Sequence, residues 1–268
     1  TRILHGLGGS TQVKSMAAAI EFGTSKIVTL VGEGNGSGPA QLLGFGVVPY
    51  DGYSDGHWNA SDEEVEQAIM KSVREAELSS GREIKEIYVG VPGDFIHLEQ
   101  NEVVLDLESE RRITPEDVDD VMNLALDYKN QREGVIIHRS PAWFTVDDRR
   151  TMEPAGLKGQ VIRCMASFVV ADPTFLEDMQ ARMEQQDIHI SGYLSPPLGE
   201  ALLLVPPEER DKVAVLVDVG YLTTEVLFIQ GDALIRYKVL PMGGGHLAAD
   251  LAMELGITMD MERSFLNV

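Results

Sequence analysis

The sequence predicts an α/β protein of two lobes, with a small α+β subdomain inserted in the first lobe. Two observations lead to this fold class. A strand–turn–strand unit begins near Ile20 and recurs, with the same residue types, near Val217. Between the two copies, from about residue 97, the pattern changes to a short strand, a helix and two more strands. Repeated units of this kind are typical of a duplicated architecture, and the block between them reads as an insertion.

The first copy opens the fold. Apolar runs at 18–22 and 27–32 flank the polar turn Gly23–Lys26, which predicts a β-hairpin. Ser61-Asp62-Glu63-Glu64 has the form of a capping box and predicts the start of a helix. The apolar run at 84–91, which stops at Pro92-Gly93, is typical of a buried strand.

The inserted block has a different order of predicted elements. A strand is expected at 101–107, and Thr114-Pro115 predicts a helix start, because proline is favoured at the first helical position. Two further strands are expected at 134–138 and 161–170. We expect this block to be a β-α-β-β insertion.

The second copy follows a helix that we expect to open at Asp172-Pro173. A strand at 213–217, a turn at 218–224 and a returning strand at 226–229 repeat the opening hairpin. Three consecutive glycines, Gly243–Gly245, then precede a helix.

Each copy joins an acid, a hydrophobe, a glycine and small hydroxyl residues between two apolar strands. The glycine lets the backbone approach a phosphate, while amides and hydroxyls bond its oxygens. The acid at the strand end can hold a hydrated divalent cation. For one copy alone an ordinary hairpin is the better explanation, but two copies favour a phosphate-clamping fold. The candidates from these turns are Glu21, Gly23, Thr24, Ser25, Asp218, Gly220, Thr223 and Thr224.

Composition excludes several classes of function. The formal net charge of −21 would repel nucleic acid and anionic lipid, so no nucleic-acid partner is expected. The single cysteine, Cys164, lies in an apolar run and is expected to be a buried, inert thiol. The histidines show no metal-ligand spacing, and no apolar run is long enough to span a bilayer. Residues 1–15 are expected to be a foreign leader and are left out of the fold prediction.

The motifs resemble those of the bacterial cell-division protein FtsA family, which belongs to the actin-like ATPases. Ala19–Ile27 resembles that family's first phosphate motif, Leu216–Glu225 resembles its second, and Leu240–Ala252 resembles the segment after the second. Within the insertion, Ile113–Val118 and Pro154–Gly159 also agree with the family. The resemblance covers nearly everything from Met16 to about Leu255 and implies actin-like, ribonuclease-H-like lobes with an FtsA-type SHS2 subdomain.

The resemblance implies a division into parts. These are a first lobe at 16–96 and 173–211, the SHS2 subdomain at 97–172, and the start of a second lobe at 212–268. Because the chain stops before the rest of that lobe, we expect an N-terminal fragment. The family implies ATP and Mg²⁺ as cofactors, with Lys26, Gly243, Gly244 and Gly245 added to the nucleotide-binding residues. Glu21 and Asp218 become the expected catalytic acids and hold Mg²⁺ through water.

The resemblance also implies a cellular role. Proteins of this family form head-to-tail polymers, bind the tubulin-like division protein FtsZ, and tether the division ring to the membrane. The expected location is therefore cytoplasmic, at the inner face of the membrane at the division site. Contact with the membrane would come through a C-terminal segment that this sequence does not contain.

Two features of the second motif leave alternatives open. Tyr221 and Leu222 stand where the family has glycines, and Glu225 stands where it usually has Asp. Side chains at these positions can block a phosphate or forbid positive φ. One alternative is therefore an interaction scaffold with a decayed cleft that works without nucleotide. Another is a pilus-assembly protein of the PilM type, which shares the inserted module.

Overall fold

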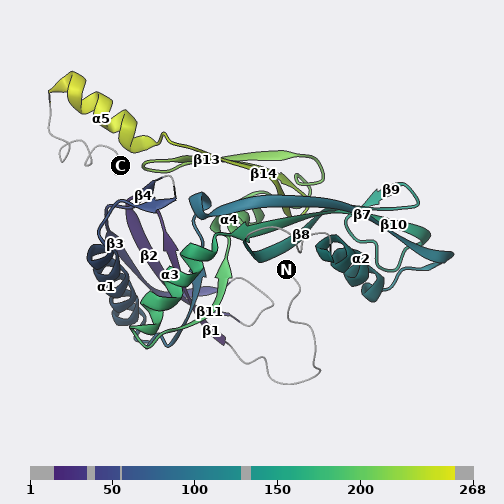
Figure 1. The fold of residues 1–268 in the computed structure, drawn as a ribbon, viewed down its shortest axis with the longest axis horizontal. Helices are drawn as coiled ribbons and strands as arrows, with labels where there is room; N and C mark the ends of the chain where they lie inside the picture. Colours follow the sequence, from purple (N-terminus) through teal and green to yellow (C-terminus); the bar gives the residue numbers. More distant parts are fainter. Residues whose placement is uncertain (1–14, 35–39, 55, 128–133, 257–268) are drawn as a thin grey trace. The chain divides into compact units, whose positions relative to one another are not determined.

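The computed structural model describes residues 15–34, 40–54, 56–127 and 134–256 (Figure 1). These residues divide into two compact units. Unit 1 ends at Gly90 and also takes in Glu177–Tyr193, whereas unit 2 takes in Val91–Leu176 and runs on from Leu194. The expected leader lies outside the described residues except for Ser15, and so do residues 257–268 of the expected second lobe.

Unit 1 is built on a five-stranded sheet in the order β11-β6-β1-β2-β3. β1 pairs with β2 in antiparallel fashion and with β6 in parallel. The strands are β1 (Ser15–Phe22), β2 (Lys26–Gly34), β3 (Gln41–Pro49), β6 (Glu86–Gly90) and β11 (His189–Leu194). The expected opening hairpin is thus present, with a three-residue turn, Gly23–Ser25, between β1 and β2.

One face of this sheet is covered by α1 (Asp62–Ser80). The helix begins with the predicted capping box of Ser61 and Glu64 and ends at Gly81, whose φ of 66° lies in the left-handed region. Its buried side carries Ser72, whose hydroxyl lies 2.9 Å from that of Thr29 on β2. The helix therefore packs closely on β2 and β3, as the apolar spacing predicts.

A second helix, α3 (Pro173–Glu184), completes unit 1 from Glu177 onward. Its Arg182 is buried and bonds the side chains of Asp178 and Asp62, each at 2.8–2.9 Å. A small hairpin of β4 (Tyr53–Ser54) and β5 (His57–Trp58) joins the sheet to α1. Arg182 thus ties α3 to the first turn of α1.

The first part of unit 2 is a four-stranded antiparallel sheet in the order β7-β10-β8-β9. Its elements are β7 (Ile96–Arg112), α2 (Pro115–Asp127), β8 (Val135–Val146), β9 (Arg149–Thr151) and β10 (Lys158–Ala171), with the short 3-10 turn η1 (Gly93–Phe95) before them. β8 continues to Val146, whereas the sequence predicted a strand only at 134–138. Pro141 lies inside it, at a shift of register against β10, which is where a strand tolerates a residue without an N–H.

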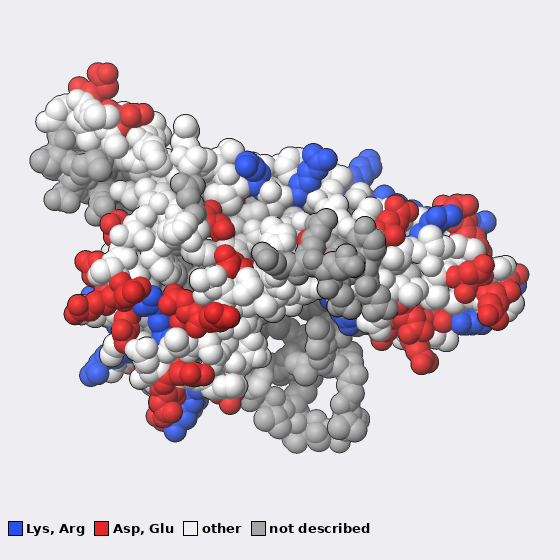
Figure 2. Space-filling model, in the orientation of Figure 1, with Lys and Arg blue, Asp and Glu red and all other residues white. Residues whose placement is uncertain are grey.

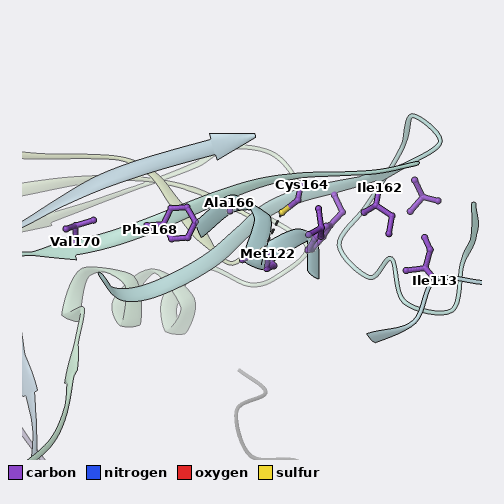
Figure 3. Close-up of a cluster of buried hydrophobic side chains, with 11 residues drawn as sticks. Ile113, Met122, Ile162, Cys164, Ala166, Phe168 and Val170 are labelled. Carbon is purple, nitrogen blue, oxygen red and sulfur yellow. Dashed lines mark hydrogen bonds between the residues drawn. The ribbon is translucent and has the colours of Figure 1, made fainter. Parts of the chain in front are cut away.

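An apolar core lies between this sheet and α2 (Figure 3). Phe168 and Cys164 on β10 are fully buried, and the Cys164 thiol lies 3.4 Å from the sulfur of Met122 on α2. The helix begins at Thr114, whose hydroxyl accepts from the amide of Asp117. The Asp117 carboxylate in turn takes two 2.7 Å bonds from Arg111. The predicted helix start and the predicted buried thiol are both confirmed.

The second part of unit 2 is a three-stranded sheet in the order β12-β13-β14. Its elements are β12 (Ala214–Val219), β13 (Thr224–Gln230), β14 (Ala233–Leu240), α4 (Pro196–Leu204) and α5 (Gly244–Leu255). Ser167 on β10 donates a hydrogen bond to the carbonyl of Leu234, so β14 lies against the four-stranded sheet. Gly244 and Gly245, expected before the last helix, form its first turn.

Candidate functional site

The turn between β1 and β2 carries the first group of predicted phosphate-binding residues. The Gly23 amide donates to the Lys26 carbonyl at 2.9 Å and closes the turn. Thr24 is buried, Ser25 is half-buried, and Glu21 and Lys26 are exposed at the ends of the two strands. The structure thus brings the five predicted residues of this motif to one sheet end.

Aromatic residues from the β3–β5 segment surround this turn and were missed as functional candidates. The Tyr50 hydroxyl donates to the Gly23 carbonyl at 2.8 Å, and the Tyr53 hydroxyl donates to the Phe22 carbonyl at 3.3 Å. The available sequence signal was the run Tyr50-Asp51-Gly52-Tyr53 directly after a strand, which is turn-like in composition.

The turn between β12 and β13 is the second predicted phosphate-binding element. The Gly220 amide donates to the Thr223 carbonyl at 2.9 Å, which repeats the closure of the first turn. Tyr221 and Leu222 occupy the middle of this turn, and neither has positive φ. The conformation present here therefore does not require glycine at these two positions.

The start of α5 packs directly on this second turn. The amides of Gly244 and Gly245 donate to the carbonyls of Gly220 and Tyr221, both at 2.8 Å. A Cβ on Gly243 would lie 2.5 Å from those two carbonyl oxygens, so only glycine fits there. The predicted glycines are therefore brought beside Gly220, but two of their amides already bond the turn.

A half-buried carboxyl group, that of Glu225, lies next to the second turn. Asp218 and Glu225 are direct partners across β12 and β13, so their side chains share one face of the sheet. Burial raises the pKa of Glu225 to about 7; the Tyr237 hydroxyl opposes the rise by hydrogen-bonding, and the charges of Asp218, Glu200 and Asp94 add to it. Glu225 is thus poised to gain or lose a proton near neutral pH.

Glu200 on α4 and Asp94 in η1 are residues that the sequence alone did not single out. Burial, followed by the charge of Asp218, raises the pKa of Glu200 as well. Their coupling to Glu225 depends on tertiary contacts, since the residues are far apart in sequence. No motif spacing could have found them.

The fit of a hydrated cation can be tested on these side chains. Within the described ranges no three His, Cys, Asp or Glu side chains converge closely enough to cage a metal ion. Mg²⁺ usually keeps several waters and takes one or two carboxylates together with substrate phosphates. Asp218, exposed beside the repelling carboxyl of Glu225, suits that outer role. The residues therefore fit a water-mediated Mg²⁺ and not a dedicated metal cage.

The two turns belong to separate compact units, the first to unit 1 and the second to unit 2. Each turn gathers its own predicted residues. The proposed binding and catalytic roles of these residues stay predictions.

Comparison with known proteins identifies the inserted block. Residues 93–170 match the model of the "SHS2 domain inserted in FTSA". The chain is 25% identical over 244 residues to the cell division protein FtsA of Escherichia coli K12, and 27% identical over 239 residues to that of Bacillus subtilis. These alignments cover 91% and 88% of this chain but 58% and 54% of the relatives. The chain thus spans a little over half the length of the curated relatives that it matches.

Solved structures agree at the level of the fold. The PilM–PilN type IV pilus biogenesis complex has a TM-score of 0.60 at 17% identity, covering 95% of this chain and 69% of that one. The ethanolamine utilization protein EutJ of Carboxydothermus hydrogenoformans has a TM-score of 0.54 at 13% identity, covering 93% of this chain and 60% of its own. The predicted actin-like α/β fold with an SHS2 insertion is confirmed, and the chain is similar to cell division proteins FtsA over most of its length.

Proposed function

We propose that this protein binds Mg-ATP at the acid–x–Gly turn between β1 and β2 and serves bacterial cell division as a nucleotide-dependent adaptor. The observation that carries the proposal is the first turn. Glu21, Gly23, Thr24, Ser25 and Lys26 stand together at one sheet end, in a turn closed by the Gly23 amide. The likeness to proteins named for cell division supports the cellular role.

The chemistry assigned to each residue follows from its position. Gly23 allows the backbone to approach a phosphate, and Thr24, Ser25 and Lys26 supply hydroxyl and ammonium donors. Bound Mg²⁺ would neutralise charge on the phosphates. Glu21 would orient the water shell of that ion, and Asp218 offers the same carboxylate chemistry in the second turn.

A titration with Mg-ATP tests the proposal. Gly23→Val places a branched side chain at the turn, where a Cβ already lies 3.2 Å from the Lys26 carbonyl, and should weaken binding about tenfold or more. Gly34→Val, at the far end of β2, is the matched control, because a Cβ there meets only ordinary contacts at 3.6 Å. If hydrolysis occurs, Glu21→Gln should abolish it. Equal affinity for wild type and Gly23→Val would contradict the proposed site.

The second turn favours one alternative function, an interaction scaffold with a decayed cleft. Tyr221 and Leu222 fill the middle of the turn, and its carbonyls already bond the start of α5. If wild type binds no nucleotide at millimolar concentration, the scaffold becomes the better proposal. Recovery of binding in the double variant Tyr221→Gly, Leu222→Gly would then show that these two side chains closed the cleft.

Polymer formation and partners extend the proposal further. Head-to-tail self-association and binding to an FtsZ-type protein are proposed from the family resemblance. Among the described residues no helix has the length and apolar character needed to cross a bilayer. Co-sedimentation with filaments of an FtsZ-type protein tests the partner, and a protein that stays in the supernatant would contradict it.

A further inference from the structure

The segment from Tyr50 to Trp58 makes hydrogen bonds to the backbone at both ends of the first turn. The Tyr50 amide donates to the Ser25 carbonyl at 3.1 Å, and its hydroxyl donates to the Gly23 carbonyl at 2.8 Å. A single residue therefore holds the carbonyls on either side of Thr24. These contacts fix the turn from outside the β1–β2 hairpin.

The middle of the turn is held by close packing. A Cβ on Gly52 would lie 2.1 Å from the Thr24 carbonyl oxygen, so the backbone at Gly52 touches the turn and no side chain fits between them. The Tyr53 hydroxyl reaches the carbonyl of Phe22, the last residue of β1. Contacts from this one segment thus reach every residue from Phe22 to Ser25.

Trp58 anchors the segment to the body of unit 1. Its ring centroid lies 5.7 Å from that of Phe22, 6.3 Å from that of Tyr50 and 6.0 Å from that of Tyr53. Its indole N–H donates to the Asp178 carboxylate on α3 at 3.1 Å. Edge-to-face packing of this kind, closed by a hydrogen bond, orients a tryptophan ring firmly.

The Tyr50 phenol is suited to act as a permanent donor. Burial raises its pKa above the ordinary range, and the negative charge of Glu21 raises it further. The hydroxyl therefore keeps its proton at every pH at which the protein would work. Glu21, the predicted cation-binding acid, is electrostatically linked to the same residue.

We propose that Tyr50, Gly52, Tyr53 and Trp58 form an aromatic clamp that holds the first turn in its phosphate-binding conformation, with Tyr50 as the positioning residue for Gly23. The clamp orders the turn before any ligand binds. The free energy of binding is therefore not reduced by the entropy cost of ordering the turn. The role of the clamp in nucleotide binding rests on the proposed function, whereas its contacts with the turn are independent of that function.

The variant Tyr50→Phe removes one hydroxyl and keeps the ring. Tyr88→Phe on β6, a change of the same kind in the same sheet, is the matched control. One hydrogen bond to a carbonyl contributes a modest net amount, so the Gly23 amide should exchange with solvent about 2- to 12-fold faster in Tyr50→Phe. The Kd for Mg-ATP should rise about 2- to 10-fold, because fewer turns are competent to bind.

A second readout follows the clamp directly. With Trp143→Phe as background, Trp58 is the remaining tryptophan, and its emission should change on addition of Mg-ATP. Tyr50→Phe should reduce that change and Tyr88→Phe should preserve it. A purely structural role for Tyr50 would leave the emission response and the Kd unaffected.

The outcomes separate the two proposals. Unchanged exchange of the Gly23 amide in Tyr50→Phe would overturn the clamp, whatever the protein binds. Faster exchange with an unchanged Kd would overturn the role of Tyr50 in positioning the site. Faster exchange in a protein whose wild type binds no Mg-ATP would support the clamp and overturn the proposed function.

Discussion

Glu225 should make the stability of unit 2 depend on pH in the direction opposite to that of an ordinary surface carboxylate. Its pKa rises from 4.5 to about 7 in the folded protein. Each pKa unit corresponds to about 1.4 kcal/mol, so the full effect is about 3 kcal/mol in the free energy of unfolding.

The sign follows from linkage. Because the folded state holds the Glu225 proton more tightly than the unfolded chain does, protonation favours folding. The contribution is fully present below about pH 4.5 and is lost as the pH rises through 7. Most of the change should therefore fall between pH 5 and 8.

The isosteric variant Glu225→Gln removes this titration. Urea unfolding of both proteins, measured from pH 5 to 8 in a Trp58→Phe background, uses Trp143 as the reporter in unit 2. The variant should gain stability over wild type as the pH rises, by up to about 3 kcal/mol. Glu102→Gln, at an exposed position of β7, is the control and should follow wild type. Parallel curves for Glu225→Gln and wild type would contradict a raised pKa for Glu225 in the folded protein.

Four further predictions concern capping, packing and the buried thiol. Asp117→Asn loses the carboxylate that bonds Arg111 and the start of α2, and should lower the stability of unit 2 by about 1–2 kcal/mol at pH 7. The same contacts hold the pKa of Asp117 well below its usual range, so this cost should shrink as the pH falls below 4 in acid denaturation. Gly46→Ala should destabilise unit 1 by about 1–3 kcal/mol, since a Cβ would lie 2.0 Å from the Ser72 carbonyl. Gly199→Ala meets nothing within 4 Å inside α4 and should raise the thermal midpoint; a loss there would contradict the packing of α4. Burial raises the pKa of the Cys164 thiol to about 12, so it should react with a disulfide reagent at pH 8 only after unfolding. Rapid reaction in the native protein would contradict the buried core.

Much of the secondary structure follows from local chemistry. The Ser61–Glu64 capping box, the Gly81 end of α1 and the Thr114-Pro115 start of α2 stand where the sequence predicts them. These residues mark helix ends because they provide hydrogen-bond partners or backbone conformations for the end N–H and C=O groups, which lack partners within the helix. The strand predicted at 134–138 stops before Pro141, whereas β8 continues to Val146, and the register shift that accommodates the proline depends on pairing with β10.

The candidate site divides in the same way. The sequence located both turns, since an acid, a glycine and hydroxyl residues between apolar strands are a local pattern. It did not predict that the amides of Gly244 and Gly245, at the start of α5, would donate hydrogen bonds to the second turn. Nor did it reveal that Tyr50 would hold the first turn, because that hydrogen bond joins segments separated by two strands, β2 and β3.

The order of residues was therefore enough to predict the class of fold, the inserted subdomain and the two turns with candidate phosphate-binding residues. Residue order carries such information because strands, caps and tight turns depend on neighbours along the chain. The groups that surround those turns became known from the three-dimensional fold. Burial of Glu225 among distant carboxylates, and of Tyr50 beside Glu21, arises from contacts that no spacing along the chain records.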